Sequence, residues 1–303
     1  MHPELKLSVQ IPMGAIKHWE RWIGTRHLSD VAIAAEQAGF DAISVTDHPF
    51  PPDAWLAAGG HHSFDPFVAL SWMGAATSRI RLLTNLIVAA YRSPYVTAKA
   101  ASSLDYLSGG RAILGMGAGY LEPEFAVLGA QFGGRGARFD AAIEAIRAAW
   151  TGESVTIPDG PFAVAEHTTL PRPAQPSGPP IWIGGNSKAA RQRVAKHGDG
   201  WMPFQQGEEM ARITGTAVVS GLDDIAAGHA DIKAGWAAAG RAGAPDVCFC
   251  PQHRGTVEQW CETVLGRERD YAAAGVTWLA YESHVRSVEE FLAEMAAFQA
   301  ALS

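Results

Sequence analysis

The stretch RLLTNLIVAAYRSPYVTAKAASSLDYLSGGRAILGM, residues 81–116, decides the fold. It opens with an apolar run at 81–87 that predicts a buried strand. Ser93-Pro94 predicts the start of a helix, because serine can cap the first turn and proline fits its first position. That helix extends to Tyr106, and residues 112–116 predict the next strand. A strand, a helix and a second strand in this order predict two parallel strands of one sheet.

The same alternation continues in both directions along the chain. Further strands are predicted over residues 5–11, 42–46, 181–183, 200–203, 246–250 and 276–281. Further helices are predicted over residues 29–38 (capped by Ser29), 65–77, 138–150, 187–197 and 220–239, and after the capping-box sequences at Thr256 and Ser287. Residues 151–179 are rich in proline and glycine and predict a surface insertion with a hairpin around 155–164. Eight strands alternating with helices predict a closed (β/α)8 TIM barrel that forms one domain over residues 1–303.

Charge and composition exclude several classes of protein. The chain has 303 residues, of which 48% are hydrophobic, and a formal net charge of -7. No basic cluster is present, so nucleic acid is not an expected partner. The three cysteines do not indicate a disulfide framework. No apolar run reaches the ~20 residues of a membrane span, and residues 1–4 do not resemble a signal peptide. A cytoplasmic protein without a membrane partner is expected.

Polar residues that directly follow predicted strands are the candidates for catalysis. In a (β/α)8 barrel the active site lies at the carboxyl ends of the strands. Asp47-His48 follows the strand at 42–46, and histidine is the side chain best suited to move a proton near neutral pH. The alternative is that Asp47 caps the following turn and His48 covers a loop. The position of the two residues is compatible with both interpretations.

A glycine turn follows the strand at 181–183. The sequence IWIGGNS, residues 181–187, leads directly into a predicted helix. Glycines allow backbone N–H groups to approach an anion, and the start of a helix supplies unpaired donors and positive potential. These features predict a phosphate cradle, with a plain turn capped by Ser187 as the alternative. The Gly-Lys-Ser/Thr ending of a Walker loop is absent.

Residues 115–119, GMGAG, do not form a dinucleotide-binding fingerprint. Tyr120 stands where the third glycine is required, and Pro123 interrupts the helix that should follow. These glycines are interpreted as room for a flat ring or its side chain near the end of a strand. A metal site is not expected, because Asp47 and His48 are adjacent rather than alternating and no His-Glu-x-x-His run exists.

Several sequence blocks together resemble the luciferase-like family of flavin- and F420-dependent oxidoreductases. The blocks occur in the order of the family and lie between residues 30 and 203. They are 34–41 (AAEQAGFD), 45–48 (VTDH), 79–85 (RIRLLTN), 104–111 (LDYLSGGR), 114–119 (LGMGAG), 122–125 (EPEF), Arg138, 144–146 (EAI), 180–185 (PIWIGG) and 199–201 (DGW). The LSGGR and IGG blocks are specific in combination, and the last third of the chain carries no comparable motif.

The resemblance implies a cofactor that lies across the strand ends, with its phosphate tail at the glycine turn. In F420-dependent members an acidic residue and a histidine follow the second strand. Asp47 would then help to seat the deazaflavin, and His48 would take part in proton transfer. Family members often carry a cis-peptide bulge in the third strand, for which Thr84-Asn85 is the expected position. The residues expected to border the cofactor are Thr84, Asn85, Gly117, Gly119, Tyr120, Gly184, Gly185, Asn186 and Ser187, besides Asp47.

The resemblance also implies hydride transfer between F420 and a small organic substrate, whose identity the sequence does not reveal. Sugar-phosphate dehydrogenases of the family place a catalytic acid where this chain has Tyr120, so the same reaction is not expected. The residues expected to shape the substrate pocket are Glu122, Trp201, Arg254, Glu282 and His284. A homodimer is expected from the resemblance, with helices 66–77 and 95–106 in contact.

An FMN-dependent monooxygenase is the alternative within the family. It would use O2 and reduced flavin from a partner reductase, whereas a deazaflavin reacts poorly with O2. Asp47-His48 favours F420. Two other classes of protein stay open: a cofactor-binding barrel without turnover, and a hydrolase barrel that holds zinc.

Overall fold

One closed sheet forms the centre of the molecule. This computed structural model describes residues 5–18 and 26–302. Within the sheet every pairing is parallel, the strand order is β3-β2-β1-β11-β10-β9-β8-β5-β4, and an additional β3–β5 pairing closes the ring. The strands are β1 (Lys6–Gln10), β2 (Ala42–Val45), β3 (Arg81–Thr84), β4 (Ile87–Val88), β5 (Ala112–Gly117), β8 (Ile181–Gly184), β9 (Gly200–Met202), β10 (Asp246–Phe249) and β11 (Trp278–Glu282). Because β3 and β4 are consecutive and both pair with β5, they share one place in the ring, which confirms the predicted (β/α)8 barrel.

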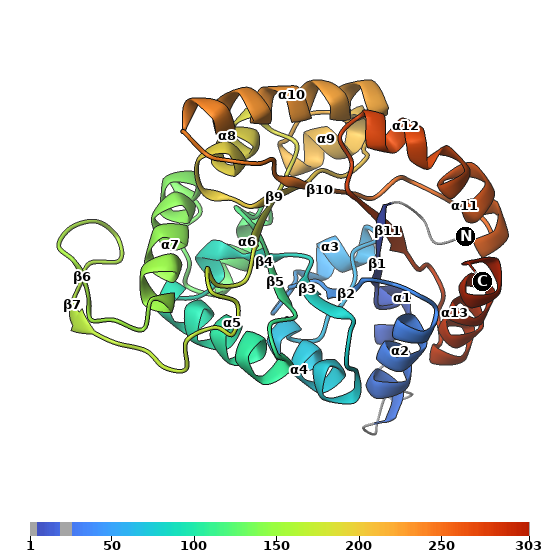
Figure 1. The fold of residues 1–303 in the computed structure, drawn as a ribbon, viewed down its shortest axis with the longest axis horizontal. Coiled ribbons are helices and arrows are strands. Elements are labelled where there is room, and N and C mark those ends of the chain that lie inside the picture. Colours follow the sequence, from blue (N-terminus) through green and yellow to red (C-terminus); the bar gives the residue numbers. More distant parts are fainter. Residues whose placement is uncertain (1–4, 19–25, 303) are drawn as a thin grey trace.

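Helices surround the barrel (Figure 1). They are α2 (Arg26–Gln37), α4 (Pro66–Ala76), α5 (Pro94–Ser108), α7 (Arg135–Trp150), α8 (Lys188–His197), α10 (Leu222–Ala238), α11 (Val257–Thr263), α12 (Glu268–Ala273) and α13 (Val288–Leu302), with short 3-10 turns η2 (Ala89–Tyr91) and η3 (Leu265–Arg267). None of the helices within residues 5–18 and 26–302 combines the length and the apolar character needed to cross a membrane.

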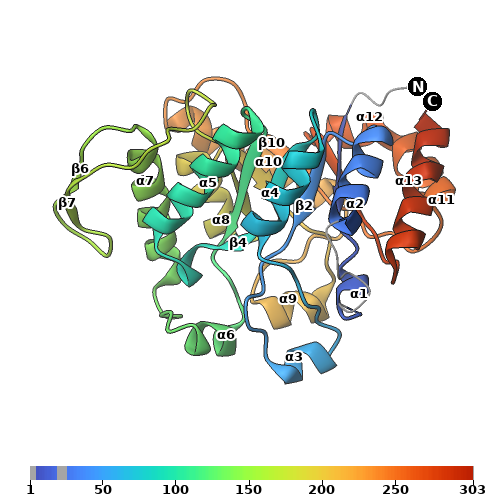
Figure 2. The same ribbon diagram turned by 90° about the horizontal axis from the view of Figure 1, so that it is seen from below.

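Short helices gather at one end of the barrel (Figure 2). They are α1 (Met13–Ile16), α3 (Asp53–Ala57), α6 (Glu122–Val127) and α9 (Glu208–Thr214). Each of them follows a strand of the barrel along the chain, so they mark the end at which the strands finish. This carboxyl end of the barrel is called the mouth below.

The helix starts follow most of the capping signals in the sequence. Asp65 accepts hydrogen bonds from the N–H groups of Phe67 and Val68 at 3.0 and 3.1 Å, which confirms the predicted cap of α4. Thr256 forms the predicted capping box at the start of α11. The expectation for Ser29 is wrong: α2 already includes Arg26, so Ser29 lies inside the helix and not at its cap.

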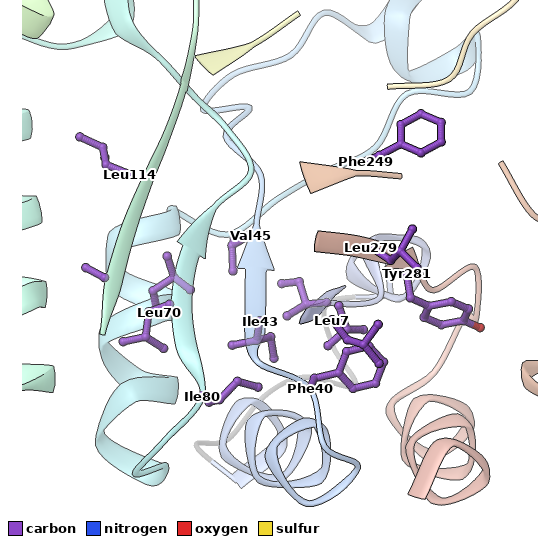
Figure 3. Packing of buried hydrophobic residues seen from close by; sticks show 14 of the residues in the cluster. Leu7, Phe40, Ile43, Val45, Leu70, Ile80, Leu114, Phe249, Leu279 and Tyr281 are labelled. Atoms are coloured by element: carbon purple, nitrogen blue, oxygen red, sulfur yellow. The ribbon is translucent and has the colours of Figure 1, made fainter. Parts of the chain in front are cut away.

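The strands are buried on both faces, as parallel strands with helices outside them must be. Their outer faces pack against the helices, and Figure 3 shows part of this layer around Leu7 and Ile43. On the inner face the rings of Trp182 and Trp278 meet edge-on with centroids 5.1 Å apart. Both residues lie near the start of their strands, so they fill the floor of the barrel. At the other end Glu282 is exposed, which shows that the mouth is open to solvent there.

The predicted insertion projects from the side of the barrel (Figure 1). It contains the antiparallel hairpin of β6 (Val155–Ile157) and β7 (Val164–His167), which confirms the hairpin predicted around residues 155–164. Gln175 lies in the segment that leads from β7 back to the barrel, and its side chain binds this segment to the barrel. Its Nε2 donates to Asp105 Oδ1 at 2.7 Å and to the carbonyl oxygen of Ala112 at 2.9 Å.

Candidate active site

His48 meets a buried carboxylate at the mouth. His48 lies just after the end of β2, and Glu124 lies in the first turn of α6, after β5. The Oε2 atom of Glu124 is 3.0 Å from Nδ1 of His48, and the Glu124 side chain is 0% exposed. The other oxygen, Oε1, accepts from the N–H of Phe50 at 3.0 Å. The pair therefore joins two loops at the mouth and fixes an imidazole near the ends of the strands.

Tyr91 supplies a third hydrogen bond to the Glu124 carboxylate. The Tyr91 hydroxyl, at the end of η2, donates to Oε2 at 2.9 Å. Burial by itself would raise the pKa of Glu124, but the hydrogen bonds from His48, Phe50 and Tyr91 hold this pKa below its usual value. Burial, and after it the charge of Glu124, raises the pKa of Tyr91. At neutral pH the carboxyl group is therefore ionised and the phenol is neutral.

Aromatic rings pack around His48. The Trp55 ring on α3 has its centroid 4.5 Å from that of His48, and the His61 ring lies 5.2 Å from it. The Trp55 side chain is also hydrogen-bonded to Tyr120. Burial, and after it the neighbouring His48, lowers the pKa of His61 to about 4, so His61 is neutral at physiological pH. The His48 side chain keeps 11% of its surface exposed within this group.

Asp47 is occupied by an arginine. Arg92 holds both of its carboxylate oxygens, with Nη1 on Oδ2 and Nη2 at 2.9 Å from Oδ1. The N–H of Val88 lies 3.4 Å from Oδ2, and Arg92 also reaches Asp65 at the cap of α4 at 3.1 Å. Sequence reasoning assigned Asp47 to the cofactor. In the structure its carboxylate instead ties the loop beside His48 to the start of α5.

The third strand is interrupted where a bulge was expected. The sequence predicts one strand over 81–87, but β3 ends at Thr84, and the peptide bond between Asn85 and Leu86 is cis. The cis bond therefore lies one residue beyond the expected Thr84-Asn85 position. Thr84 is buried, and its hydroxyl donates to the carbonyl oxygen of Gly115 at 2.8 Å. Asn85 is half-buried at the mouth.

Two of the predicted cofactor glycines make room for a leucine. A Cβ atom on Gly117 would lie 2.5 Å from Leu86 Cδ1, and one on Gly184 would lie 2.0 Å from Leu86 Cδ2. Glycine is therefore needed at both positions because the Leu86 side chain occupies the space that a Cβ atom would take. Gly119 has a φ of +76°, and a Cβ there would meet Val88 and Phe125, so its role is to turn the chain toward Tyr120.

The glycine turn ahead of α8 is held by its own neighbours. The Gly185 N–H donates to Met202, and the Asn186 side chain is fully buried, where it bonds to the backbone of Phe204 and Ala217. The Asn186 N–H donates to the Thr216 hydroxyl at 3.2 Å. The expectation that Gly185 and Asn186 grip a phosphate is therefore not supported by their hydrogen bonds.

The helix start just beyond this turn retains donors for an anion. Ser187 caps α8 by accepting from the N–H of Ala190 at 3.1 Å, which confirms its capping role. The N–H groups of the first helical residues have no acceptor within their own helix. In the described part of the chain, Lys188 and Ala189 therefore present N–H donors and the positive end of the α8 dipole.

Four of the five expected substrate-pocket residues lie in exposed positions after the strands. They are Glu122 on α6, Arg254 after β10, and Glu282 and His284 at and after the end of β11. Glu282 faces the interior of the barrel, because it lies on the same face of β11 as Trp278 and Ala280, which pack inside.

Trp201 does not line the mouth, which corrects the expectation. It is 1% exposed, and a Cβ on Gly228 of α10 would lie 2.4 Å from its ring. Met202, the next residue of β9, packs inside the barrel, so Trp201 must point outward to the helices. Its indole N–H donates to the Gly185 carbonyl oxygen at 2.9 Å. Trp201 therefore supports the glycine turn from outside.

Sequence reasoning missed four side chains that organise the site: Trp55, Tyr91, Arg92 and, as a partner of His48, Glu124. A usable signal existed for two of them. Tyr91 and Arg92 stand between the end of a strand and the Ser93-Pro94 helix start, where candidate residues are sought. No group of three or more metal-ligating side chains occurs among the residues that the structure describes.

Comparison with known proteins agrees with the fold. Residues 12–254 match the family described as luciferase-like monooxygenase. The chain is thus an enzyme, and it belongs to the luciferase-like monooxygenase family. An F420-dependent glucose-6-phosphate dehydrogenase from Amycolatopsis mediterranei is 33% identical over 186 residues, which are 59% of this chain and 53% of the relative. The chain thus matches about half the length of that curated relative.

Two solved structures share the fold at low identity. A monooxygenase, RslO1, from Streptomyces bottropensis superimposes with a TM-score of 0.77 at 20% identity and 98% coverage of both chains. A coenzyme F420-dependent tetrahydromethanopterin reductase from Methanopyrus kandleri gives a TM-score of 0.68 at 17% identity, with 97% of each chain covered. Both confirm the barrel over nearly the whole chain.

Proposed function

We propose that this protein is an F420-dependent oxidoreductase that transfers a hydride between the deazaflavin and a small organic substrate. The observation that carries the proposal is the contact between His48 and the buried, ionised Glu124 at the mouth. When bound, the deazaflavin supplies the ring carbon that gives or takes the hydride. His48 gives or takes the proton that accompanies it.

The residues at the mouth fit a long anionic cofactor. The N–H groups of Lys188 and Ala189 at the start of α8 offer donors and positive potential to a phosphate. The ring would lie between this helix and His48, bordered by Asn85, Gly119 and Tyr120. Asp47 contributes indirectly, because its pair with Arg92 fixes the loop that carries His48.

The curated relatives support F420 without assigning the substrate. These relatives are named F420-dependent glucose-6-phosphate dehydrogenases, but this chain matches only part of their length. Tyr120 stands where a catalytic acid is expected in sugar-phosphate dehydrogenases, and its side chain is hydrogen-bonded to that of Trp55. We therefore propose a different substrate, in contact with Trp55, Tyr120 and Glu282.

Cofactor binding provides the test. The purified chain is titrated with F420 and, separately, with FMN, while tryptophan fluorescence is recorded. Quenching by F420 at micromolar concentration, with none by FMN, is the expected result. Tight binding of FMN alone would overturn the proposal in favour of an FMN-dependent monooxygenase, and binding of neither would remove the cofactor assignment.

We further propose a homodimer formed through α4 and α5. A hollow of about 700 Å³ lies between these helices, lined by residues that include Phe67, Trp72 and Ala100. Val68 and Trp72, which both line this hollow, are 69% and 45% exposed. Contiguous exposed apolar side chains of this kind mark association surfaces. Sedimentation of the wild type as a dimer, and of a Val68→Glu variant as a monomer, is expected; a monomeric wild type would contradict the proposal.

A further inference from the structure

We propose that Glu124 is a positioning residue that fixes His48 as one tautomer, with the hydrogen on Nδ1 and a free lone pair on Nε2. The inference rests on the proposed function, because it assigns the nitrogen through which His48 exchanges its proton. It also concerns the chain by itself, since the tautomer exists before any cofactor or substrate binds.

The argument begins with the number of donors around the carboxylate. An ionised carboxylate only accepts hydrogen bonds. Phe50 contributes a backbone N–H and Tyr91 a hydroxyl, and both donate to Glu124. The third contact, 3.0 Å to His48 Nδ1, is favourable only if Nδ1 also carries a hydrogen. The neutral imidazole has a single N–H, so Nε2 must then be unprotonated.

No neighbouring group reverses this assignment. Glu124 is 0% exposed, so solvent does not compete for its oxygens. The titratable groups that face His48 are Glu124 from α6, Tyr91 from η2, and His61 from the loop after α3. His61 is neutral and Tyr91 keeps its proton, whereas the charge of Asp47 is paired with Arg92. Among the residues that the structure describes, Glu124 therefore carries the unbalanced charge next to the imidazole.

The fixed tautomer defines the proton step. The two ring nitrogens point in different directions, so Nε2 faces away from Glu124. With a deazaflavin bound as the hydride acceptor, Nε2 would take the proton that the oxidised substrate loses, and His48 would become an imidazolium beside the Glu124 carboxylate. In the reverse direction Nε2–H would return that proton to the substrate. The carboxylate stays ionised throughout and stabilises the cationic ring.

The test reads the tautomer directly in the chain without cofactor. The histidine rings are labelled with ¹⁵N, and long-range ¹H–¹⁵N spectra are recorded; a His48→Gln variant identifies the His48 signals. We expect the wild type to show a protonated Nδ1 and an unprotonated Nε2. Glu124→Gln should mix the tautomers, because an amide can either donate or accept. Tyr91→Phe should keep the Nδ1–H tautomer, because the Glu124 carboxylate that accepts from Nδ1 is retained.

A matched control separates this role from folding. Glu294 is also a carboxylate that accepts from a tyrosine, with Tyr281 at 2.8 Å and Ser283 at 2.6 Å, but it contacts no histidine in the described structure. Glu294→Gln should leave the His48 signals unchanged. If Glu124→Gln fails to fold, the wild-type spectrum decides by itself: a wild type whose hydrogen is on Nε2 overturns the proposal.

Kinetics then distinguish this inference from the proposed function. With F420 and a substrate in hand, Glu124→Gln should lower kcat by about 10²–10⁴-fold, move the pH profile of kcat/KM and leave the Kd for F420 unchanged. A wild type that does not bind F420 would contradict the proposed function and leave the tautomer result standing. An unchanged pH profile in Glu124→Gln would overturn the inference while the proposed function survives.

Discussion

Replacing Arg92 by methionine should destabilise the fold more than the loss of any surface ion pair. The pair of Arg92 with Asp47 is the reason: the Asp47 side chain is 2% exposed and that of Arg92 is 18% exposed. Without the guanidinium, Asp47 retains a buried charge, and its remaining hydrogen bond within the described part of the chain is the one from the Val88 N–H at 3.4 Å. Removing one partner of a buried pair costs about 3–5 kcal/mol of unfolding free energy. That is a large share of a typical total of about 5–15 kcal/mol.

Urea unfolding followed by circular dichroism measures this loss. Arg267→Met is the matched control, because Arg267 pairs with Asp270 at 3.0 Å but both side chains are 57% exposed. Its expected cost is below about 1 kcal/mol. The double variant Arg92→Met with Asp47→Asn should recover part of the loss, since the buried group is then neutral. Equal midpoints for Arg92→Met and Arg267→Met would refute the reasoning.

Three further predictions test other parts of the account. The pKa of His61 is lowered from 6.5 to about 4, so the unfolded chain binds a proton first as the pH falls, and stability should drop between about pH 6.5 and 4. His61→Phe should flatten this part of a plot of melting temperature against pH, and an equally steep plot for the variant would speak against a neutral His61 in the folded chain. Trp201→Ala should lower the free energy of unfolding by about 3–5 kcal/mol in urea titrations without changing the KM for the substrate. A raised KM in a variant that stays stable would show that Trp201 contacts the substrate after all. Lys188→Glu should raise the Kd for F420 several-fold in fluorescence titrations, because a charge at a helix terminus contributes about 0.3–1 kcal/mol. Lys196→Glu, in the last turn of α8, should leave this Kd unchanged. Equal effects of the two substitutions would place the phosphate tail elsewhere.

The sequence alone predicted the barrel and most of its element boundaries. Local signals sufficed where the physics is local, as at Asp65, whose carboxylate caps the helix that begins one residue later. The prediction failed at the third strand, because the break after Thr84 depends on Leu86 packing against glycines of two other strands. Helices α3, α6 and α9 were also missed, since each is short and lies within a loop at the mouth.

The candidate site was predicted only as far as single residues at strand ends. His48 was found because it follows a strand, but its partner Glu124 is 76 positions away in sequence, and no spacing reveals that contact. Trp201 was misplaced for a different reason. Parallel strands are apolar on both faces, so the alternation of Gly200, Trp201 and Met202 does not show which face points inward. The packing of Trp201 against Gly228 of α10, together with Met202 inside the barrel, decides it.

A crystal structure of the chain with bound F420 tests the central claim most directly. The account predicts the deazaflavin ring across the mouth within reach of His48 Nε2, with the phosphate at the N–H groups of Lys188 and Ala189. A ring bound on another face of the barrel, or a phosphate far from the start of α8, would contradict it.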